Sequence, residues 1–292
     1  MDTRMILIID FNNMFFGSWF GDPLINSRGM NVNAIKAFFF KVKSLKDSID
    51  PDYIVFANDL GRDHTFRRRL YKGYKAQRKP LDMDIIDQRK EAIRISNLMG
   101  YPLIGHELYE ADDIIGMISK YATENGMNTI ISSTDRDLYQ LVNENVAIIS
   151  PKSREFIDPG WIYEKYRLTP SQWIELKILQ GDRSDNIPGI DGIGEVTALK
   201  LLHQYHSIEN IYANLHHIRE SIRNALKDGI DRLPLIRELV TIVTDYTKID
   251  FNLSMIEHHE IYRDELFTLL RELELYSLYD IMNYSLLLGR IR

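Results

Sequence analysis

The sequence contains no cysteine, which excludes both a disulfide framework and a thiolate metal site. Any bound metal ion must therefore be held by oxygen or imidazole ligands, and this favours hard cations such as Mg²⁺ or Mn²⁺. No apolar run approaches the roughly 18 residues that a membrane-spanning helix needs. The short apolar stretch near the N-terminus also lacks the small-residue cleavage site of a signal peptide. We therefore expect a globular protein of the cytoplasm.

The chain also lacks an overall positive charge, since its formal net charge is −6, and this argues against uniform attraction to nucleic acid. Its basic side chains are instead concentrated in residues 62–79, where eight Lys or Arg stand against one Asp. We call these residues the basic segment. Phe66, Tyr71 and Tyr74 lie between the cations, a mixture typical of segments that bind phosphates and stack on bases. A solvated basic surface is the alternative.

Strand-like and helix-like patterns alternate through the first half of the chain. Apolar β-branched runs at 4–10 and 53–59 flank a segment, 32–49, whose apolar residues have helical spacing. Further strands are expected at 101–105, 127–135 and 145–150, and further helices at 82–98 and 110–126. This order predicts an α/β fold with a mostly parallel central sheet and flanking helices. Because helices dominate later, we expect an α/β unit over 1–158 and a helical region over 159–292.

Acidic residues recur where the expected strands end and where the following helices begin. They are Asp10, Asp59, Glu110, Asp112, Asp113, Asp135, Asp137, Asp182 and Asp185. The carboxyl ends of parallel strands meet at one edge of a sheet, so these side chains should converge on one site. Each acid alone suits a helix cap or turn, but caps do not need doubled acids at several places. Crowded carboxylates repel one another until divalent cations bind, and two such ions could activate a water for phosphodiester displacement.

A turn rich in glycine follows the last of these acids. Within the stretch GIDGIGEVTALKLL, Gly192 and Gly194 let the backbone approach a ligand, and the first amides of the following helix can bind phosphate. We name residues 189–194 the glycine turn and expect it to clamp a duplex backbone without reading its sequence. An ordinary corner between two helices is the alternative.

The stretches YEADD, STDRDLYQL and GDRSDNIPGIDGIG, together with the pattern from Phe66 to Lys75, resemble the 5′-nuclease or flap endonuclease family. That family includes the 5′-nuclease domain of bacterial DNA polymerase I and free-standing phage 5′-exonucleases. The similarity runs from Asp10 to about Tyr205. It implies a PIN-like nuclease core with a helical arch at about 60–80 and a helix-three-turn-helix motif at about 176–205. It also implies a free-standing monomer in a bacterial cytoplasm or a phage-infected cell.

The resemblance implies roles for individual side chains. One metal ion would be held by Asp10, Asp59, Glu110, Asp112 and Asp135, and a second by Asp137, Asp182 and Asp185, with Asp113 supporting through water. Lys75 and Arg78 would lie over the scissile phosphate as catalytic residues, and DNA would be contacted by Arg67, Tyr71, Tyr74, Lys177, Gly192, Gly194 and Lys200. The glycine turn could also bind K⁺ through its carbonyls.

Three positions depart from the family pattern. Phe11 stands where many relatives carry a glycine, and Val196 stands where many carry a lysine, so the clamp would rely more on Lys200. Asn58 competes with Asp59 as a metal ligand, and we prefer Asp59 because a carboxylate binds Mg²⁺ better than an amide does.

Together these features imply a Mg²⁺-dependent or Mn²⁺-dependent nuclease that cuts near 5′-strand junctions of branched or nicked DNA. It would also degrade 5′ ends and remove RNA primers. One alternative is a PIN-type ribonuclease, which the glycine turn and the basic segment disfavour. The other is a non-catalytic structure-specific DNA-binding protein, which the acid set disfavours because carboxylates repel phosphate.

Overall fold

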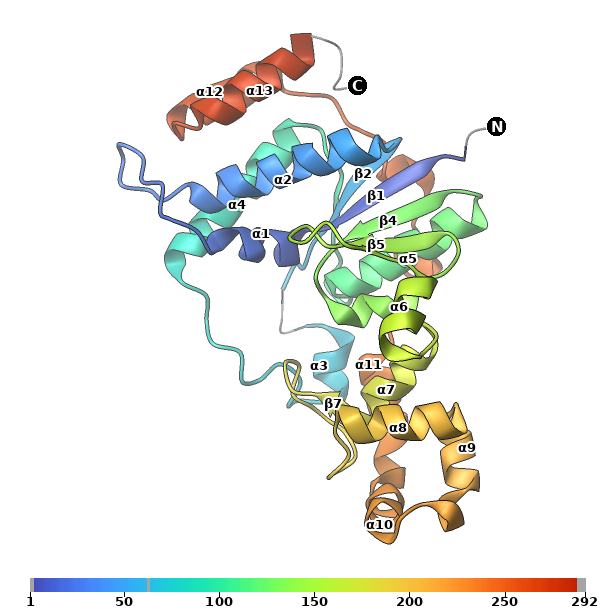
Figure 1. The fold of residues 1–292 in the computed structure, drawn as a ribbon. Coiled ribbons are helices and arrows are strands. Elements are labelled where there is room, and N and C mark those ends of the chain that lie inside the picture. Colours follow the sequence, from blue (N-terminus) through green and yellow to red (C-terminus); the bar gives the residue numbers. More distant parts are fainter. Residues whose placement is uncertain (1–2, 62–63, 288–292) are drawn as a thin grey trace.

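A six-stranded sheet forms the centre of the computed structural model, which describes residues 3–61 and 64–287 (Figure 1). Its spatial order is β3-β2-β1-β4-β5-β6. The strands are β1 (Met5–Asp10), β2 (Tyr53–Ala57), β3 (Leu103–Ile104), β4 (Asn128–Ser132), β5 (Val146–Ile149) and β6 (Phe156–Ile157). All neighbours pair in parallel except β5 and β6, which are antiparallel. The predicted mostly parallel α/β fold is therefore confirmed.

Strand β1 lies at the middle of this sheet and is buried along nearly its whole length. Ile8 pairs with Val55 of β2 on one side and with Ile131 of β4 on the other. The chain runs from β1 to β2 and β3 in one direction and then returns to β4 and β5 in the other. The carboxyl end of β1 is therefore a topological switch point, the place where open parallel sheets bind ligands.

The helices cover both faces of the sheet (Figure 1). One face packs against α1 (Phe11–Trp19), α2 (Asn33–Ile49) and α4 (Met83–Leu98), and the other packs against α5 (Ala111–Glu124). Successive side chains of a strand point to opposite faces of the sheet. Leu7 and Ile9 of β1 therefore belong to the core on the first face, whereas Ile6 and Ile8 belong to the core on the second. Two separate cores thus hold the sheet rigid beneath its carboxyl edge.

Helix α1 is an element that the sequence patterns did not indicate. It follows β1 without a connecting loop, and Asp10 both ends the strand and caps the helix by accepting a hydrogen bond from the Asn13 amide. Phe11 is fully buried, and its ring lies 4.9 Å from Phe38 and 5.8 Å from Phe56 between centroids. The departure at Phe11 therefore fills the core and does not face the carboxyl edge.

The basic segment is less helical than the family resemblance implies. Only α3 (Phe66–Leu70) is helical, and residues 72–77 form turns before α4 begins. Lys75 has a left-handed backbone with φ of 52°, which a helix does not accommodate. Residues 62 and 63, where the expected segment begins, lie outside the described residues. The segment is thus one short helix followed by an irregular chain that leads to α4 (Figure 1).

Beyond β6 the chain forms a helical region next to the carboxyl edge of the sheet (Figure 1). Its helices are α6 (Pro159–Tyr166), α7 (Gln172–Gln180), α8 (Glu195–Tyr205), α9 (Ile208–Ala213), α10 (Glu220–Gly229) and α11 (Leu233–Val240). Short 3₁₀ helices occupy Leu215–His217, Ile230–Arg232, Tyr246–Ile249 and Leu253–Met255, and another, Arg136–Leu141, lies earlier in the chain between β4 and β5. Helices α7 and α8 pack together and are joined by the pair β7 (Gly181–Asp182) and β8 (Ile187–Pro188), then by the glycine turn.

The last described helices, α12 (Arg263–Glu272) and α13 (Tyr276–Leu287), return to the first face of the sheet. Leu269, Leu270, Leu273 and Leu275 are buried there. Helix α12 contacts α4, and α13 contacts α2. Across the described residues, no helix combines the length and the apolar character needed to cross a membrane.

Candidate active site

The carboxyl edge of the sheet carries the acidic residues that follow its strands, and we call it the acidic edge. The Asp10 carboxylate accepts hydrogen bonds from the Asn13 amide at 3.1 Å and from the Ser133 hydroxyl at 2.9 Å. Asp59 accepts one from the Ala111 amide, at the start of α5, at 2.8 Å. Asp135 caps the 3₁₀ helix after β4. Strand ends and helix caps therefore place these acids at one edge.

The acidic edge holds its carboxylates in an environment that disfavours their charge. Burial raises the pKa of Asp10 to about 7, and repulsion from Asp59 and Asp135 adds to the effect. Burial and the neighbouring Asp135 and Asp10 also raise the pKa of Asp112 well above its usual value. Asp137 follows the same pattern, with its pKa raised to about 6 by burial and by Asp135. These acids are therefore close enough to oppose one another's ionisation.

A second set of acids surrounds Lys177 of α7. Its ammonium lies 2.6 Å from Asp182 Oδ2 and forms an even closer ion pair with Asp137. Burial alone would lower the pKa of Lys177, but the attraction of Asp137 and Asp182 outweighs the effect of burial and raises this pKa. For Asp182, hydrogen bonds from Lys177 and Ser184 outweigh burial and lower its pKa. Lys177 thus binds acidic side chains here, and its expected contact with DNA is not available in this arrangement.

The basic segment reaches the acidic edge through Lys75 and Arg78. Lys75 Nζ lies 2.6 Å from Glu110 Oε1 and 3.5 Å from Asp185 Oδ2. Arg78 Nη2 lies 2.6 Å from Asp185 Oδ1, and the Lys75 amide donates to the Asp185 carbonyl at 2.8 Å. A small cavity of about 220 Å³ opens beside them, lined by Arg68, Tyr74, Lys75, Ala76, Arg78, Pro80 and Glu110. The two predicted catalytic cations therefore lie against the predicted metal ligands.

Two residues expected to contact DNA are buried within the protein. Tyr74 is only 3% exposed, and its hydroxyl lies 2.6 Å from Glu110 Oε2 and 3.0 Å from Asp185 Oδ2. Its ring cannot stack on a base, and burial beside these acids raises the pKa of its hydroxyl. Arg67 is also 3% exposed. In this arrangement neither Tyr74 nor Arg67 is accessible to DNA, whereas Tyr71 is partly exposed.

Asp113 differs from the other acids because it faces away from the acidic edge. It is fully buried and accepts two hydrogen bonds from the Arg67 guanidinium, at 2.6 and 2.8 Å. The amides of Glu110 and Val243 also donate to it. With both oxygens occupied by internal donors, Asp113 has no free position for a metal-bound water, and the expected supporting role is not supported.

The side chains of the acidic edge are chemically suited to bind a hard divalent cation. Its side chains offer carboxylate oxygens, and a cation would relieve the repulsion that raises the pKa of Asp10, Asp112 and Asp137. Within the residues that the structure describes, no three acidic or histidine side chains already form a group able to hold a metal ion. Lys75 and Lys177 lie between carboxylates instead. A cation at these carboxylates would therefore compete with the two lysines for the same oxygens.

The glycine turn presents its backbone to solvent. Gly192 has a φ of +80°, a conformation suited to glycine, and a Cβ at Gly192 or Gly194 would meet nothing within 4 Å. Val196 is 68% exposed in the first turn of α8, and Lys200 is exposed one turn later. The turn and the start of α8 thus offer an open surface.

Comparison with known families identifies the architecture. Residues 5–167 match the model of the 5′-3′ exonuclease N-terminal resolvase-like domain, and residues 168–264 match that of the 5′-3′ exonuclease C-terminal SAM fold. The chain belongs to the 5′-3′ exonuclease family.

Several relatives of this exonuclease-family chain are bacterial DNA polymerases I. The thermostable enzyme of Thermus thermophilus is 36% identical over 249 residues, which is 84% of this chain and 30% of that protein. The Bacillus subtilis enzyme is 31% identical over 281 residues, which is 93% of this chain and 31% of that protein. The chain thus spans about a third of the length of these curated relatives.

Solved structures share the fold of this exonuclease-family chain at low sequence identity. A structure of T5 5′-exonuclease with bound divalent metal ions (zinc) matches with a TM-score of 0.70 and 21% identity, over 92% of this chain and 98% of the other. The catalytic core of Rad2 in complex with a DNA substrate matches with a TM-score of 0.58 and 15% identity, over 93% and 87%. These likenesses show the fold alone.

The sequence patterns did not single out Arg89 of α4, which contacts residues beside the acidic edge. Its guanidinium donates to the Asn12 side chain, to the Asn58 side chain and to the Asp59 carbonyl. These partners lie 77, 31 and 30 residues away in the sequence, so no local motif could reveal them. An isolated arginine in an amphipathic helix is usually a surface residue.

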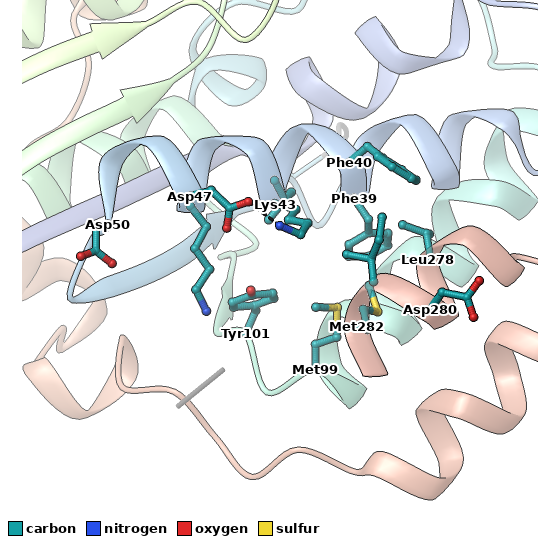
Figure 2. Close-up of a pocket in the computed structure, with 13 residues that line it drawn as sticks. Phe39, Phe40, Lys43, Asp47, Asp50, Met99, Tyr101, Leu278, Asp280 and Met282 are labelled. Carbon is teal, nitrogen blue, oxygen red and sulfur yellow. Dashed lines mark hydrogen bonds and ion pairs between the residues drawn. The ribbon is translucent and has the colours of Figure 1, made fainter. Parts of the chain in front are cut away.

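A cavity lies away from the acidic edge, between α2 and α13 (Figure 2). It has a volume of about 910 Å³, and its walls include Phe39, Met99, Tyr101, Leu278 and Met282. Figure 2 shows Lys43, Asp47, Asp50 and Asp280 around it. None of the predicted metal ligands contributes to its wall, so the acidic edge and not this cavity is the candidate exonuclease site.

Proposed function

We propose that this chain is a divalent-metal-dependent 5′-nuclease that hydrolyses phosphodiesters near the 5′-strand junctions of branched or nicked DNA. It would also degrade 5′ ends and remove RNA from primer junctions. The observation that carries this proposal is the contact between the basic segment and the acidic edge, where Lys75 and Arg78 bind Glu110 and Asp185. Phosphate-binding cations and cation-binding carboxylates are thereby brought to one place.

The metal ligands that we propose come from the acidic edge and from residues 182–185, which lie between α7 and α8. One ion would be held from among Asp10, Asp59, Glu110, Asp112 and Asp135, and a second from among Asp137, Asp182 and Asp185. Mg²⁺ is the preferred candidate, with Mn²⁺ as a substitute, since both are hard cations with oxygen ligands. Two bound ions would activate the attacking water and stabilise both oxygens of the displacement.

The chain's own cations would act on the phosphodiester directly. Lys75 and Arg78 are tethered to carboxylates that would turn towards the bound metal, which would leave the ammonium and guanidinium groups to bind the scissile phosphate. Their positive charge would stabilise the negative charge that develops on the phosphate oxygens in the transition state. Lys177 would similarly be released from Asp137 and Asp182.

The duplex would be held by the glycine turn and the start of α8. Gly192, Gly194 and Lys200 are exposed there, and amides at a helix N-terminus bind phosphate without reading sequence. Carbonyls of the same turn could bind K⁺. Because the acidic loop with Asp182 and Asp185 immediately precedes the turn, duplex binding and cleavage would keep a fixed spacing. We propose that the chain does this as a monomer in the cytoplasm.

The test is cleavage of a 5′-labelled flap on nicked duplex DNA in Mg²⁺ or EDTA by the native protein and by Asp135→Asn. Asparagine caps a helix about as well as aspartate does, so this variant should fold. We expect Mg²⁺-dependent cutting near the junction by the native protein and its loss in Asp135→Asn. Asp87→Asn, which removes an exposed acid on α4, should cut normally.

Other results would identify one of the alternative functions. Binding of the flap without cutting in either Mg²⁺ or Mn²⁺ would make this a structure-specific DNA-binding protein. Cleavage of single-stranded RNA in preference to the flap would make it a PIN-type ribonuclease. Cutting that persists in EDTA would contradict the role of the carboxylates.

A further inference from the structure

Arg89 lies in α4, the helix that follows the basic segment, and it points towards the end of β1. Its Nε donates to Asn12 Oδ1 at 2.8 Å. Its Nη2 donates to the Asn58 side-chain oxygen and, at 3.2 Å, to the Asp59 carbonyl. The guanidinium also lies 5.7 Å from the centroid of the buried Phe11 ring. One half-buried side chain thus joins α4 to the first turn of α1 and to the residues that follow β2.

The contact with Asn12 continues to the Asp59 carboxylate. An amide side chain has an acceptor oxygen on one side and a donor nitrogen on the other. Because Arg89 occupies the Asn12 oxygen, the Asn12 nitrogen is directed at Asp59 Oδ2, to which it donates at 2.8 Å. The Ala111 amide holds Asp59 Oδ1 at 2.8 Å. Both oxygens of Asp59 are therefore fixed in direction, and each keeps a lone pair for a further ligand.

Arg89 also fixes the backbone that carries this carboxylate. Its Nη2 donates hydrogen bonds to the carbonyl of Asp59 and to the side-chain oxygen of Asn58, two consecutive residues after β2. Residues 58–60 are not in a strand or helix, so no regular ladder holds them. A lysine in place of Arg89 would keep the charge but could not make these divergent contacts, since an ammonium lacks the planar fork of a guanidinium.

We propose that Arg89 is a positioning residue, which orients the Asp59 carboxylate for divalent-cation binding through Asn12 and through the Asp59 backbone. The inference rests on the proposed function, because it assigns Asp59 to the metal site. Partners that orient a metal ligand without touching the metal commonly contribute 10- to 100-fold, as a rough range, to metal affinity or activity. Arg89 would thus fix the direction of the Asp59 carboxylate and not merely add positive charge near the acidic edge.

The experiment compares Arg89→Ala, Arg89→Lys, Asn12→Ala and the Arg89→Ala/Asn12→Ala double variant. Mn²⁺ binding is measured by titration calorimetry on the protein without DNA, and the half-saturating Mg²⁺ concentration is measured in flap cleavage. Arg94→Ala is the matched control, since Arg94 is an arginine of the same helix with a 59% exposed side chain paired to Glu91. Melting temperatures in EDTA establish that each variant is folded.

We expect Arg89→Ala to weaken Mn²⁺ binding and to raise the half-saturating Mg²⁺ concentration by about 10-fold. Saturating Mg²⁺ should restore much of the lost rate, because the lesion is in metal binding. Arg89→Lys should resemble Arg89→Ala, and Asn12→Ala should add little to Arg89→Ala because Arg89→Ala already interrupts the path through Asn12. Arg94→Ala should match the native protein.

Three results would overturn the proposal. They are unchanged metal binding in a folded Arg89→Ala, native affinity in Arg89→Lys, and additive effects of Arg89→Ala and Asn12→Ala. If Arg89→Ala does not fold, Arg89→Lys and Asn12→Ala decide the question by the same criteria. A native protein that binds Mn²⁺ but does not cleave would contradict the proposed nuclease function, while the calorimetry would still test the role of Arg89.

Discussion

The Arg67 guanidinium donates two hydrogen bonds, of 2.6 and 2.8 Å, to the Asp113 carboxylate in the interior of the protein. Arg67 also donates to the carbonyls of Leu239 and Thr241 at 2.8 and 2.9 Å. The pair therefore connects α3 and α5 with the chain that leaves α11. Burial opposes the charge of Arg67, but Asp113 outweighs it and raises the arginine's pKa.

Arg67→Ala should destabilise the protein by about 3–5 kcal/mol, because it leaves the Asp113 carboxylate buried without its partner. Urea unfolding followed by circular dichroism measures this loss. Arg69→Ala provides the control, since Arg69 is exposed in the same helix and should change the free energy of unfolding by less than about 0.5 kcal/mol. Equal stability of the two variants would contradict the structural role of Arg67.

Lys75→Ala should slow flap cleavage by roughly 100-fold with little effect on duplex binding, because the ammonium stabilises charge that develops in the transition state. Single-turnover cleavage and fluorescence anisotropy in EDTA separate these two effects. Lys79→Ala removes an exposed cation four residues later and should cleave almost normally. A loss of duplex binding that accounts for the whole defect of Lys75→Ala would place Lys75 in DNA binding and not in catalysis.

The metal-free protein should lose stability as the pH rises from about 4 to about 7. Asp10 ionises with a pKa of 3.8 in the unfolded chain but only at about 7 when folded, so the folded state binds more protons in that interval and the free energy of unfolding falls. The raised pKa of Asp137, about 6, acts in the same direction.

Mg²⁺ should therefore raise the melting temperature more at pH 8 than at pH 5, where protonated carboxylates bind it poorly. Thermal unfolding in Mg²⁺ and in EDTA at both pH values tests this, and Asp10→Asn should flatten the pH dependence of the EDTA series. A melting temperature in EDTA that rises between pH 5 and pH 8 would be the opposite outcome and would exclude Asp10 as the dominant titrating group.

Val196→Lys should strengthen duplex binding and steepen its dependence on salt. Val196 is 68% exposed in the first turn of α8, and one added phosphate contact changes the slope of log K against log salt by about 0.9. Anisotropy titrations at several salt concentrations measure this slope. Tyr276→Lys adds the same charge at an exposed position of α13, far from α8 in Figure 1, and should leave the slope nearly unchanged.

Much of the sheet could be predicted because its strands are apolar β-branched runs with clear ends. The same holds for α2, α4 and α5, which combine helical spacing with a helix stop signal such as Gly100 or Gly126, both with positive φ. Helix α1 was missed because it begins at the residue after β1, which leaves no polar loop to separate the two patterns.

The acidic edge could be predicted as a group, because strand ends converge whatever the side-chain details. The burial of side chains within the basic segment could not be predicted, since Arg67 and Tyr74 bind partners 46 and 36 residues later in the chain. Charge and aromaticity look the same in a sequence whether a side chain faces phosphate or a buried carboxylate. The metal ligands, the catalytic cations and the duplex contacts at Gly192, Gly194 and Lys200 stay predictions.

The return of α12 and α13 to the first face of the sheet affects the order in which the protein can fold. Leu266, Leu270 and Leu278 share one core with Phe38 and Phe56, so this face is completed by residues synthesised more than 200 positions after β2. A nascent chain that has released only the α/β segments keeps this surface uncovered. The helix that carries Arg89 thus gains its final support only near the end of synthesis of these residues.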